Sequence, residues 1–162
     1  MNDERNQELP DALAELLDGA RLEERAEHVF ELLTVSEAGW PHIALLSVGE
    51  VLVTSPRRLM LGLWPTSTTT ANLRQSGRAV LQLYHAGAAY RARLECRPRA
   101  EQAAQAARLA IFDCRITQLS RDAVGYARLT SGPRIELPDA DRVVARWRAQ
   151  VHTLRRAAED AA

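Results

Sequence analysis

Apolar and polar residues alternate with a period of two along residues 90–97. Tyr90, Ala92, Leu94 and Cys96 fall on one side, and arginine or glutamate fills the positions between them. Successive side chains of a β-strand point to opposite faces of the sheet. The segment is therefore predicted to be a strand with one buried face.

Short apolar runs separated by turn-forming residues precede this strand. Turns are predicted at 37–41, 49–50 and 55–58, and they separate strands at 32–35, 42–48, 51–54 and 59–64. Further strands are predicted at 78–84 and 109–119, with a short last one at 135–137. Closely spaced turns between apolar runs favour an antiparallel meander.

Helical spacing of apolar residues predicts helices at both ends of the chain. A helical segment is expected over about 10–33, with an interruption at Asp18-Gly19, and a C-terminal helix over about 138–158. The alanine-rich stretch 101–108 is also helix-prone. No linker or repeat divides the chain, so a single domain over 1–162 is expected, with the barrel strands lying between about 33 and 137.

The junction between the strand at 59–64 and the next helix is rich in hydroxyl groups. Pro65 ends the strand, and the residues that follow are Thr66, Ser67, Thr68, Thr69 and Thr70. A serine or threonine at such a junction commonly caps a helix. The free amides and the dipole of a helix start also favour an anion, so this junction is a candidate phosphate site. On local sequence alone, the capped helix is the commoner of the two interpretations.

Composition and charge limit the function classes. The 162 residues are 46% hydrophobic and 26% charged, and 21 basic residues balance 21 acidic ones. This balance gives no electrostatic case for binding nucleic acid or a membrane. No export signal or apolar run of about 18 residues is visible, so a cytoplasmic location is expected. Cys96 and Cys114 lie in apolar runs and are interpreted as reduced core thiols.

Several catalytic motifs are absent. The chain has no glycine-rich dinucleotide or phosphate loop, no Gly-x-Ser-x-Gly elbow, and no His-Glu-x-x-His pair for zinc. Its four histidines, His28, His42, His85 and His152, are widely spaced, and no metal site is expected. No catalytic residue can be assigned. If the protein is an enzyme, a bound cofactor is expected to carry the chemistry.

The order of these segments resembles the pyridoxamine 5'-phosphate oxidase-like family of FMN-binding split barrels. The resembling segments are 33–35 with 39–42, 61–64, Ser67 followed by Asn72-Leu73, and 79–83. The resemblance implies a mainly β fold with flanking helices, built on a six-stranded antiparallel Greek-key barrel. It also implies a homodimer that holds FMN at the subunit interface, and an oxidoreductase acting on a small molecule.

The family pattern also implies which residues hold the cofactor. Oxidases of the family grip the FMN phosphate with a Ser-Arg-Lys run, where this chain has Ser67, Thr68 and Thr69. They also use an arginine and a lysine on the preceding hairpin strand, where His42 and Ser47 stand here. The loss of these basic groups removes charge-assisted hydrogen bonds and argues against a true pyridoxamine phosphate oxidase.

Further cofactor contacts follow from the same resemblance. Asn72 completes the motif, the backbone amides of residues 47–49 are expected near the edge of the flavin ring, and Trp64 is placed beside it. For Trp64 the simpler interpretation is a core residue. The missing charge is expected from one of four arginines: Arg57, Arg58, Arg74 or Arg78.

Two alternatives to the FMN oxidoreductase stay open. Relatives of this barrel bind the deazaflavin F420 or haem, and the uncharged phosphate motif is compatible with either exchange. The second alternative is a dimeric flavin-binding module without catalytic activity.

Overall fold

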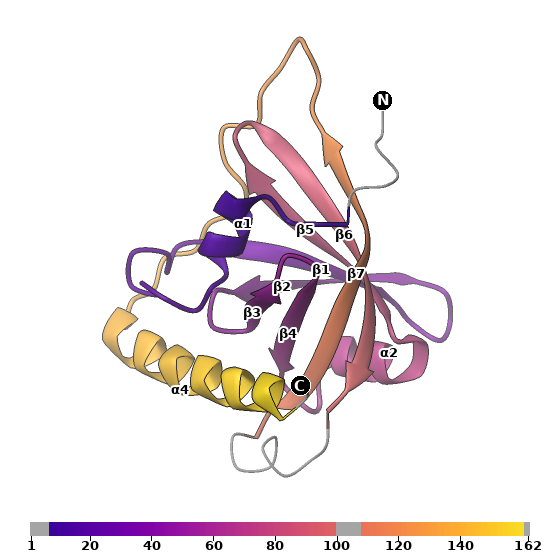
Figure 1. Cartoon of the computed structure of the whole chain (residues 1–162), viewed down its shortest axis with the longest axis vertical. Helices are drawn as coiled ribbons and strands as arrows, with labels where there is room; N and C mark the ends of the chain where they lie inside the picture. The colour runs from indigo at the N-terminus through magenta and orange to yellow at the C-terminus, as the bar shows by residue number, and fades with distance from the viewer. Residues whose placement is uncertain (1–6, 100–107, 161–162) are drawn as a thin grey trace.

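The computed structural model describes residues 7–99 and 108–160 of the chain (Figure 1). These residues form three helices and one seven-stranded antiparallel sheet. The helices are α1 (Asp11–Leu16), α2 (Thr68–Ser76) and α4 (Ala140–Glu159). The strands are β1 (Val29–Val35), β2 (Pro41–Ser47), β3 (Val51–Ser55), β4 (Arg58–Leu63), β5 (Arg78–His85), β6 (Ala88–Pro98) and β7 (Ala110–Asp122).

The sheet curls until its two edges approach each other. Its strand order is β2-β1-β5-β6-β7-β4-β3, so the edge strands β2 and β3 are consecutive in the chain. Only residues 48–50 connect them, which forces the two edges together. The fold is therefore the predicted split barrel with flanking helices, built from seven strands where six were expected.

Each helix covers a different part of the sheet. Helix α4 packs on β3 and β4, whereas α2 packs on β1 and β2. Figure 1 shows these two helices on opposite sides of the strands. Trp147, Val151 and Leu154 bury the apolar face of α4 in the hydrophobic core, as the helical spacing predicted. Asp139 caps this helix by accepting a hydrogen bond from the Arg142 amide.

The N-terminal helix prediction is wrong over most of its length. Helix α1 ends at Leu16, turns occupy much of the chain up to residue 27, and residues 29–35 form β1. Gly19 and Arg21 both have positive φ, which interrupts helical geometry. Val29, Phe30 and Leu33 have a spacing that fits one helix face, yet Phe30, Leu32 and Thr34 alternate into the core as a strand requires.

Two further predictions concern a strand at 135–137 and a helix at 101–108. The strand predicted at 135–137 is wrong, because the described chain forms only an isolated bridge between Arg134 and His28 there. The adjacent Ile135 amide donates a hydrogen bond to the Glu27 carbonyl at 2.9 Å. The helix predicted at 101–108 lies almost entirely outside the described residues.

The two cysteines confirm the prediction of free core thiols. Cys96 on β6 and Cys114 on β7 are direct partners in the antiparallel register, and both are buried and free. Burial raises the pKa of the Cys114 thiol, and its contact with Cys96 raises that pKa further. Both effects favour the uncharged thiol.

Candidate functional site

The hydroxyl-rich junction forms the start of α2, as the sequence predicted. Ser67 is the N-cap residue, and its Oγ accepts a hydrogen bond from the Thr70 amide at 3.1 Å. The Ala71 amide bonds the Ser67 carbonyl at 3.1 Å. Among the described residues, the amides of Thr68 and Thr69 have no acceptor, because a first-turn amide has none within its own helix.

Thr70 fixes the direction in which the chain enters α2. Its Oγ1 donates to the Trp64 carbonyl at 2.7 Å, and the Ser67 amide reaches the same carbonyl at 3.1 Å. Thr69 and Thr70, in the first turn of α2, are buried, whereas Thr66 and Thr68 are exposed. The Trp64 side chain is 53% exposed, so its interpretation as a core residue is wrong. An open aromatic ring therefore lies next to the helix start.

Asn72 ties α2 to the first hairpin. Its side-chain amide donates to Thr34 Oγ1 at 3.0 Å, and both residues are buried. Thr34 lies directly opposite His42 in the β1–β2 register, so the His42 side chain is on the face of the hairpin that α2 covers. The fold thus brings His42 and Asn72 to one region, on elements that are far apart in the chain.

Ser47 lies at the other end of β2 and has a different environment. Its amide and its hydroxyl donate to Glu50 Oε2 at 2.7 and 2.8 Å. Burial raises the pKa of the Glu50 carboxyl, against the lowering effect of the Ser47 bonds and of the Arg146 charge. A Cβ on Gly49 would lie 2.2 Å from the Trp147 ring, so this turn sits directly against α4. Within the chain, the polar groups of Ser47 are thus already satisfied.

The four arginines proposed to replace the missing charge differ in their partners. Arg57 pairs with Glu8 at 3.0 Å, and Arg58 pairs with Asp113 at 2.6 Å. Arg74 extends back along α2, and its Nη1 lies 3.5 Å from the Pro65 carbonyl oxygen. Its positive charge is therefore near the start of α2. In the described part of the chain, the Arg78 side chain has no hydrogen bond or ion pair.

A hollow of about 740 Å³ opens on the outer face of the sheet, near the C-terminal end of α2. Its apolar side comes from β1, the start of β2, and β5, and includes Leu33, Val35 and Val80. Arg78 and Arg93 line its other side. Of these lining residues, Arg78 was a candidate from the sequence for the missing phosphate charge, and the outward arginines of β6 were visible in the alternating pattern.

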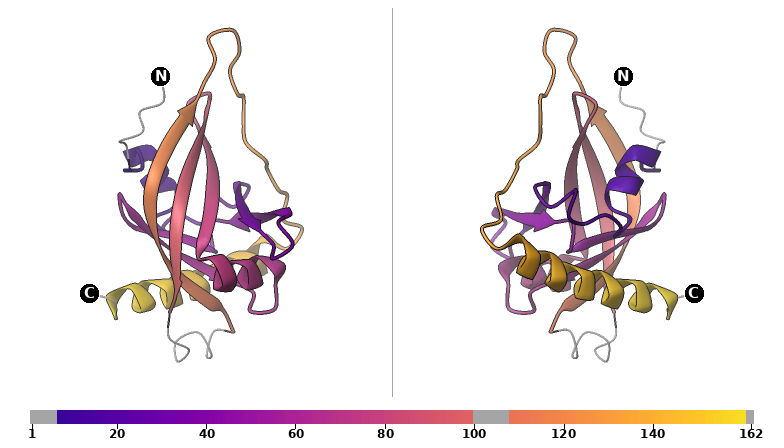
Figure 2. Two further views of the ribbon diagram at one scale, coloured as in Figure 1. Left: turned by 90° about the vertical axis from the view of Figure 1, so that its right-hand side faces the viewer. Right: turned by 90° about the vertical axis from the view of Figure 1, so that its left-hand side faces the viewer.

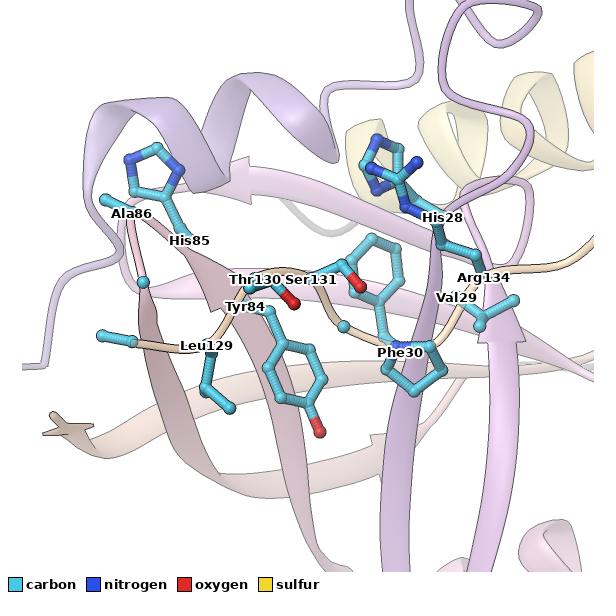
Figure 3. Close-up of a pocket in the computed structure, with 14 residues that line it drawn as sticks. His28, Val29, Phe30, Tyr84, His85, Ala86, Leu129, Thr130, Ser131 and Arg134 are labelled. Atoms are coloured by element: carbon cyan, nitrogen blue, oxygen red, sulfur yellow. The ribbon is translucent and has the colours of Figure 1, made fainter. Parts of the chain in front are cut away.

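A smaller cavity of about 210 Å³ lies between β1, the β5–β6 turn and residues 129–134 (Figure 3). His28 and Arg134 lie at one end of the view and His85 at the other. Burial lowers the pKa of His28, and the Arg134 and Arg25 charges lower it further, against the raising effect of Glu27. The lowered pKa favours the neutral imidazole of His28.

Tyr84 borders the same cavity and belongs to a polar network on the sheet. Its hydroxyl donates to the Glu31 carboxylate, and Gln82 Nε2 donates to Glu31 Oε2 at 2.8 Å. Burial and the Glu31 bond raise the pKa of Tyr84. Arg91 extends the network to Gln82 at 2.9 Å and to Asp122 at 3.1 Å. No pattern in the sequence indicates this network, because it depends on the register of four strands.

Two kinds of site are absent from residues 7–99 and 108–160. No group of three or more histidine, cysteine, aspartate or glutamate side chains is arranged to hold a metal ion. Over the same residues, no helix has the length and apolar character needed to cross a membrane.

Comparison with known proteins gives one close relative by sequence. YclD, an uncharacterized protein of Bacillus subtilis (strain 168), is 39% identical over 148 residues, which cover 91% of this chain and 96% of YclD. No model of a known protein family matches the chain.

Solved structures share the fold at low sequence identity. A candidate pyridoxamine 5'-phosphate oxidase of Lactobacillus delbrueckii matches 74% of this chain and 98% of its own, with a TM-score of 0.57 and 14% identity. An FMN-binding protein of Syntrophomonas wolfei matches 68% of this chain and 88% of its own, with a TM-score of 0.51 and 16% identity. The chain therefore belongs to the same family as YclD, and its fold is that of the pyridoxamine 5'-phosphate oxidase-like split barrels.

Proposed function

We propose that this protein is an FMN-binding oxidoreductase that seats the cofactor phosphate at the start of α2. The observation that carries the proposal is the pair of amides of Thr68 and Thr69, which have no acceptor among the described residues and lie beside the Ser67 and Thr68 hydroxyls. A helix start of this kind attracts an anion through its amides and its dipole. The FMN-binding protein from Syntrophomonas wolfei, which has the same fold, supports the choice of cofactor.

The residues at this end of α2 fit a phosphate that is held loosely. Hydroxyls and amides supply neutral donors in place of the family's arginine and lysine, and neutral donors bond an anion more weakly. Arg74 adds one positive charge near Pro65. His42, on the face of the β1–β2 hairpin that α2 covers, is the further residue proposed to contact the cofactor. Bound FMN would supply hydride or electron transfer, and the chain would bind and orient it.

The exposed Trp64 supports a homodimer with the cofactor at its interface. Its ring is 53% exposed directly beside the proposed phosphate seat. Tryptophan is enriched at the buried centres of protein interfaces, so covering this ring by a second subunit would also exclude water from the cofactor. The substrate we propose is a small molecule that reaches this interface, in a cytoplasmic protein.

The test is an absorbance spectrum of the purified protein from 300 to 550 nm, recorded before and after incubation with FMN and desalting. Flavin bands retained at about one per subunit would support the proposal. The Thr68→Glu variant tests where the phosphate binds, because it places a carboxylate at the proposed phosphate seat. Acidic residues stabilise the first turn of a helix, so this variant should fold normally and lose the flavin.

The other outcomes distinguish the alternatives. Retention of F420 or haem in the same protocol, with no retention of FMN, would reject the FMN proposal and keep a cofactor-binding barrel. A protein whose retained flavin is reduced by dithionite, but not by NADH, NADPH or any other small-molecule donor tested, would be a flavin-binding module without catalytic activity. Equal FMN retention by the wild type and Thr68→Glu would place the phosphate away from α2.

A further inference from the structure

Two cysteines lie side by side in the core, on the neighbouring strands β6 and β7 (Figure 1). Cys96 is the direct register partner of Cys114, and the two thiols contact each other through a hydrogen bond. Cys96 alternates with the exposed residues Glu95 and Arg97, so its side chain points to the buried side of β6. Both cysteines belong to the hydrophobic core, and a second subunit on the outer face of the sheet would leave the pair unchanged.

The backbone places the pair at the closer of the two kinds of antiparallel position. The Cys96 amide donates to the Gly77 carbonyl at 2.7 Å, away from β7, whereas the Arg99 amide donates to the Ile111 carbonyl of β7 at 2.8 Å. Amides along a strand point alternately to its two sides, so Cys96 and Cys114 form a non-hydrogen-bonded pair.

This position suits a disulfide bond. Opposite Cα atoms of a non-hydrogen-bonded pair lie about 4.5 Å apart, and their side chains are closer than in a hydrogen-bonded pair. Cysteines joined by a disulfide usually have their Cα atoms about 4.4–6.8 Å apart. The native register of β6 and β7 can therefore accept the bond without a change of strand pairing.

We propose that Cys96 and Cys114 are a redox pair that a peroxide oxidises to a cross-strand disulfide. Both cysteines are free, so the structure holds the reduced form of the pair. Cys96 reacts first, because it is 5% exposed whereas Cys114 is 0% exposed. Cys96 also lies two residues before the end of β6 at Pro98, where local opening of a strand end admits a small oxidant.

The oxidation has two balanced steps. The Cys96 sulfur attacks one oxygen of hydrogen peroxide and breaks the O–O bond, which gives a sulfenic acid and releases the other oxygen as water with the thiol proton. The Cys114 sulfur then attacks the Cys96 sulfur, forms the S–S bond and displaces the sulfenic oxygen as a second water, which takes the Cys114 proton. The two thiols lose two protons and two electrons, and the peroxide takes up both.

The bond would have a measurable effect on stability. It would close a loop over residues 97–113 and restrict the unfolded chain. Such a loop should raise the thermal midpoint by about 5–10 °C. The step needs no flavin, so this proposal and the FMN proposal can succeed or fail independently.

The experiment treats the reduced, desalted full-length protein with hydrogen peroxide and stops the reaction with catalase. Thiols are then counted in denaturant with a chromogenic disulfide reagent, and the intact mass is recorded. The wild type should lose both thiols and the mass of two hydrogen atoms, and dithiothreitol should restore both. Peptide mapping without reductant should recover Cys96 and Cys114 in one linked species.

Two single variants are the matched controls. Alanine suits these positions because a buried cysteine behaves as a small apolar residue. In Cys114→Ala, oxidation of Cys96 should stop at the sulfenic acid, which dimedone traps. In Cys96→Ala, the fully buried Cys114 should give about tenfold less dimedone adduct. Peroxide should raise the thermal midpoint of neither variant.

Four results would overturn the proposal. The first is retention of both wild-type thiols at a peroxide concentration that oxidises free glutathione completely. The second is a disulfide that links two chains on a non-reducing gel. The third is formation of the bond in urea but not in the folded protein, because the native register would then not bring the sulfurs together. The fourth is an equal rise of the thermal midpoint in the wild type and in Cys114→Ala.

Discussion

Asn72 on α2 donates a hydrogen bond to Thr34 on β1 at 3.0 Å, and the two residues are separated by 38 positions in the chain. Asn72 is 4% exposed and Thr34 is 2% exposed, so neither group can bond water instead. This bond sets the position of α2, and with it the proposed phosphate seat, relative to the first hairpin.

The first prediction concerns this buried pair. Asn72→Ala should lower the free energy of unfolding by about 1–3 kcal/mol, because the Thr34 hydroxyl loses its partner in the core. Replacing both polar groups, as Asn72→Leu with Thr34→Val, should cost less than the sum of the two single changes. Chemical denaturation of the four proteins measures this coupling, and strict additivity of the two effects would contradict it.

The second prediction concerns the cap and the charge at the start of α2. Ser67→Ala should lower the free energy of unfolding by about 1 kcal/mol, because the Thr70 amide loses its acceptor.

Thr68→Arg restores one basic group of the family's phosphate grip and should tighten FMN binding in a fluorescence titration. Gln75→Arg, an exposed position near the other end of the same helix, is the matched control and should leave FMN affinity unchanged.

The third prediction concerns the turn between β2 and β3. In Gly49→Ala, the new methyl group would meet the Trp147 ring at 2.2 Å, so α4 must shift. We expect a loss of about 1–3 kcal/mol in the free energy of unfolding. Gly125→Ala places a methyl group with no neighbour within 4 Å and should leave the thermal midpoint unchanged. A similar loss in both variants would show that backbone freedom, and not the contact with Trp147, is responsible.

The fourth prediction concerns the pH dependence of stability. Burial raises the pKa of Glu50 above its ordinary value of 4.5, so the folded protein holds this proton more tightly than the unfolded chain does. Stability from this group therefore increases as pH falls through the raised pKa toward 4.5, and decreases as pH rises through the same window. Glu50→Gln should remove this slope. Parallel pH profiles of the free energy of unfolding for the two proteins would contradict the assignment.

The antiparallel strands followed from local sequence because they are short and bounded by turn residues such as Pro41 and Gly49, whereas the split barrel followed from the resemblance to a known family. Local spacing failed at residues 29–33, where the same apolar positions fit a helix face and a buried strand. The Ser67 cap was predictable from neighbouring residues alone. The Asn72–Thr34 bond, the Glu50–Ser47 pair and the Arg78–Arg93 hollow were not, because they depend on strand register and burial.

The strand order has a consequence for how the protein is made. Residues 29–63 supply β1 to β4, which form two separate hairpins, β1–β2 and β3–β4, with no ladder between them. The sheet joins these hairpins only through β5, β6 and β7, the last of which ends at Asp122 (Figure 2). A chain emerging from the ribosome therefore carries two unjoined halves until most of it has been synthesised, with the edges of both hairpins open to other chains. Rapid synthesis of the segment from β5 to β7 shortens that exposure.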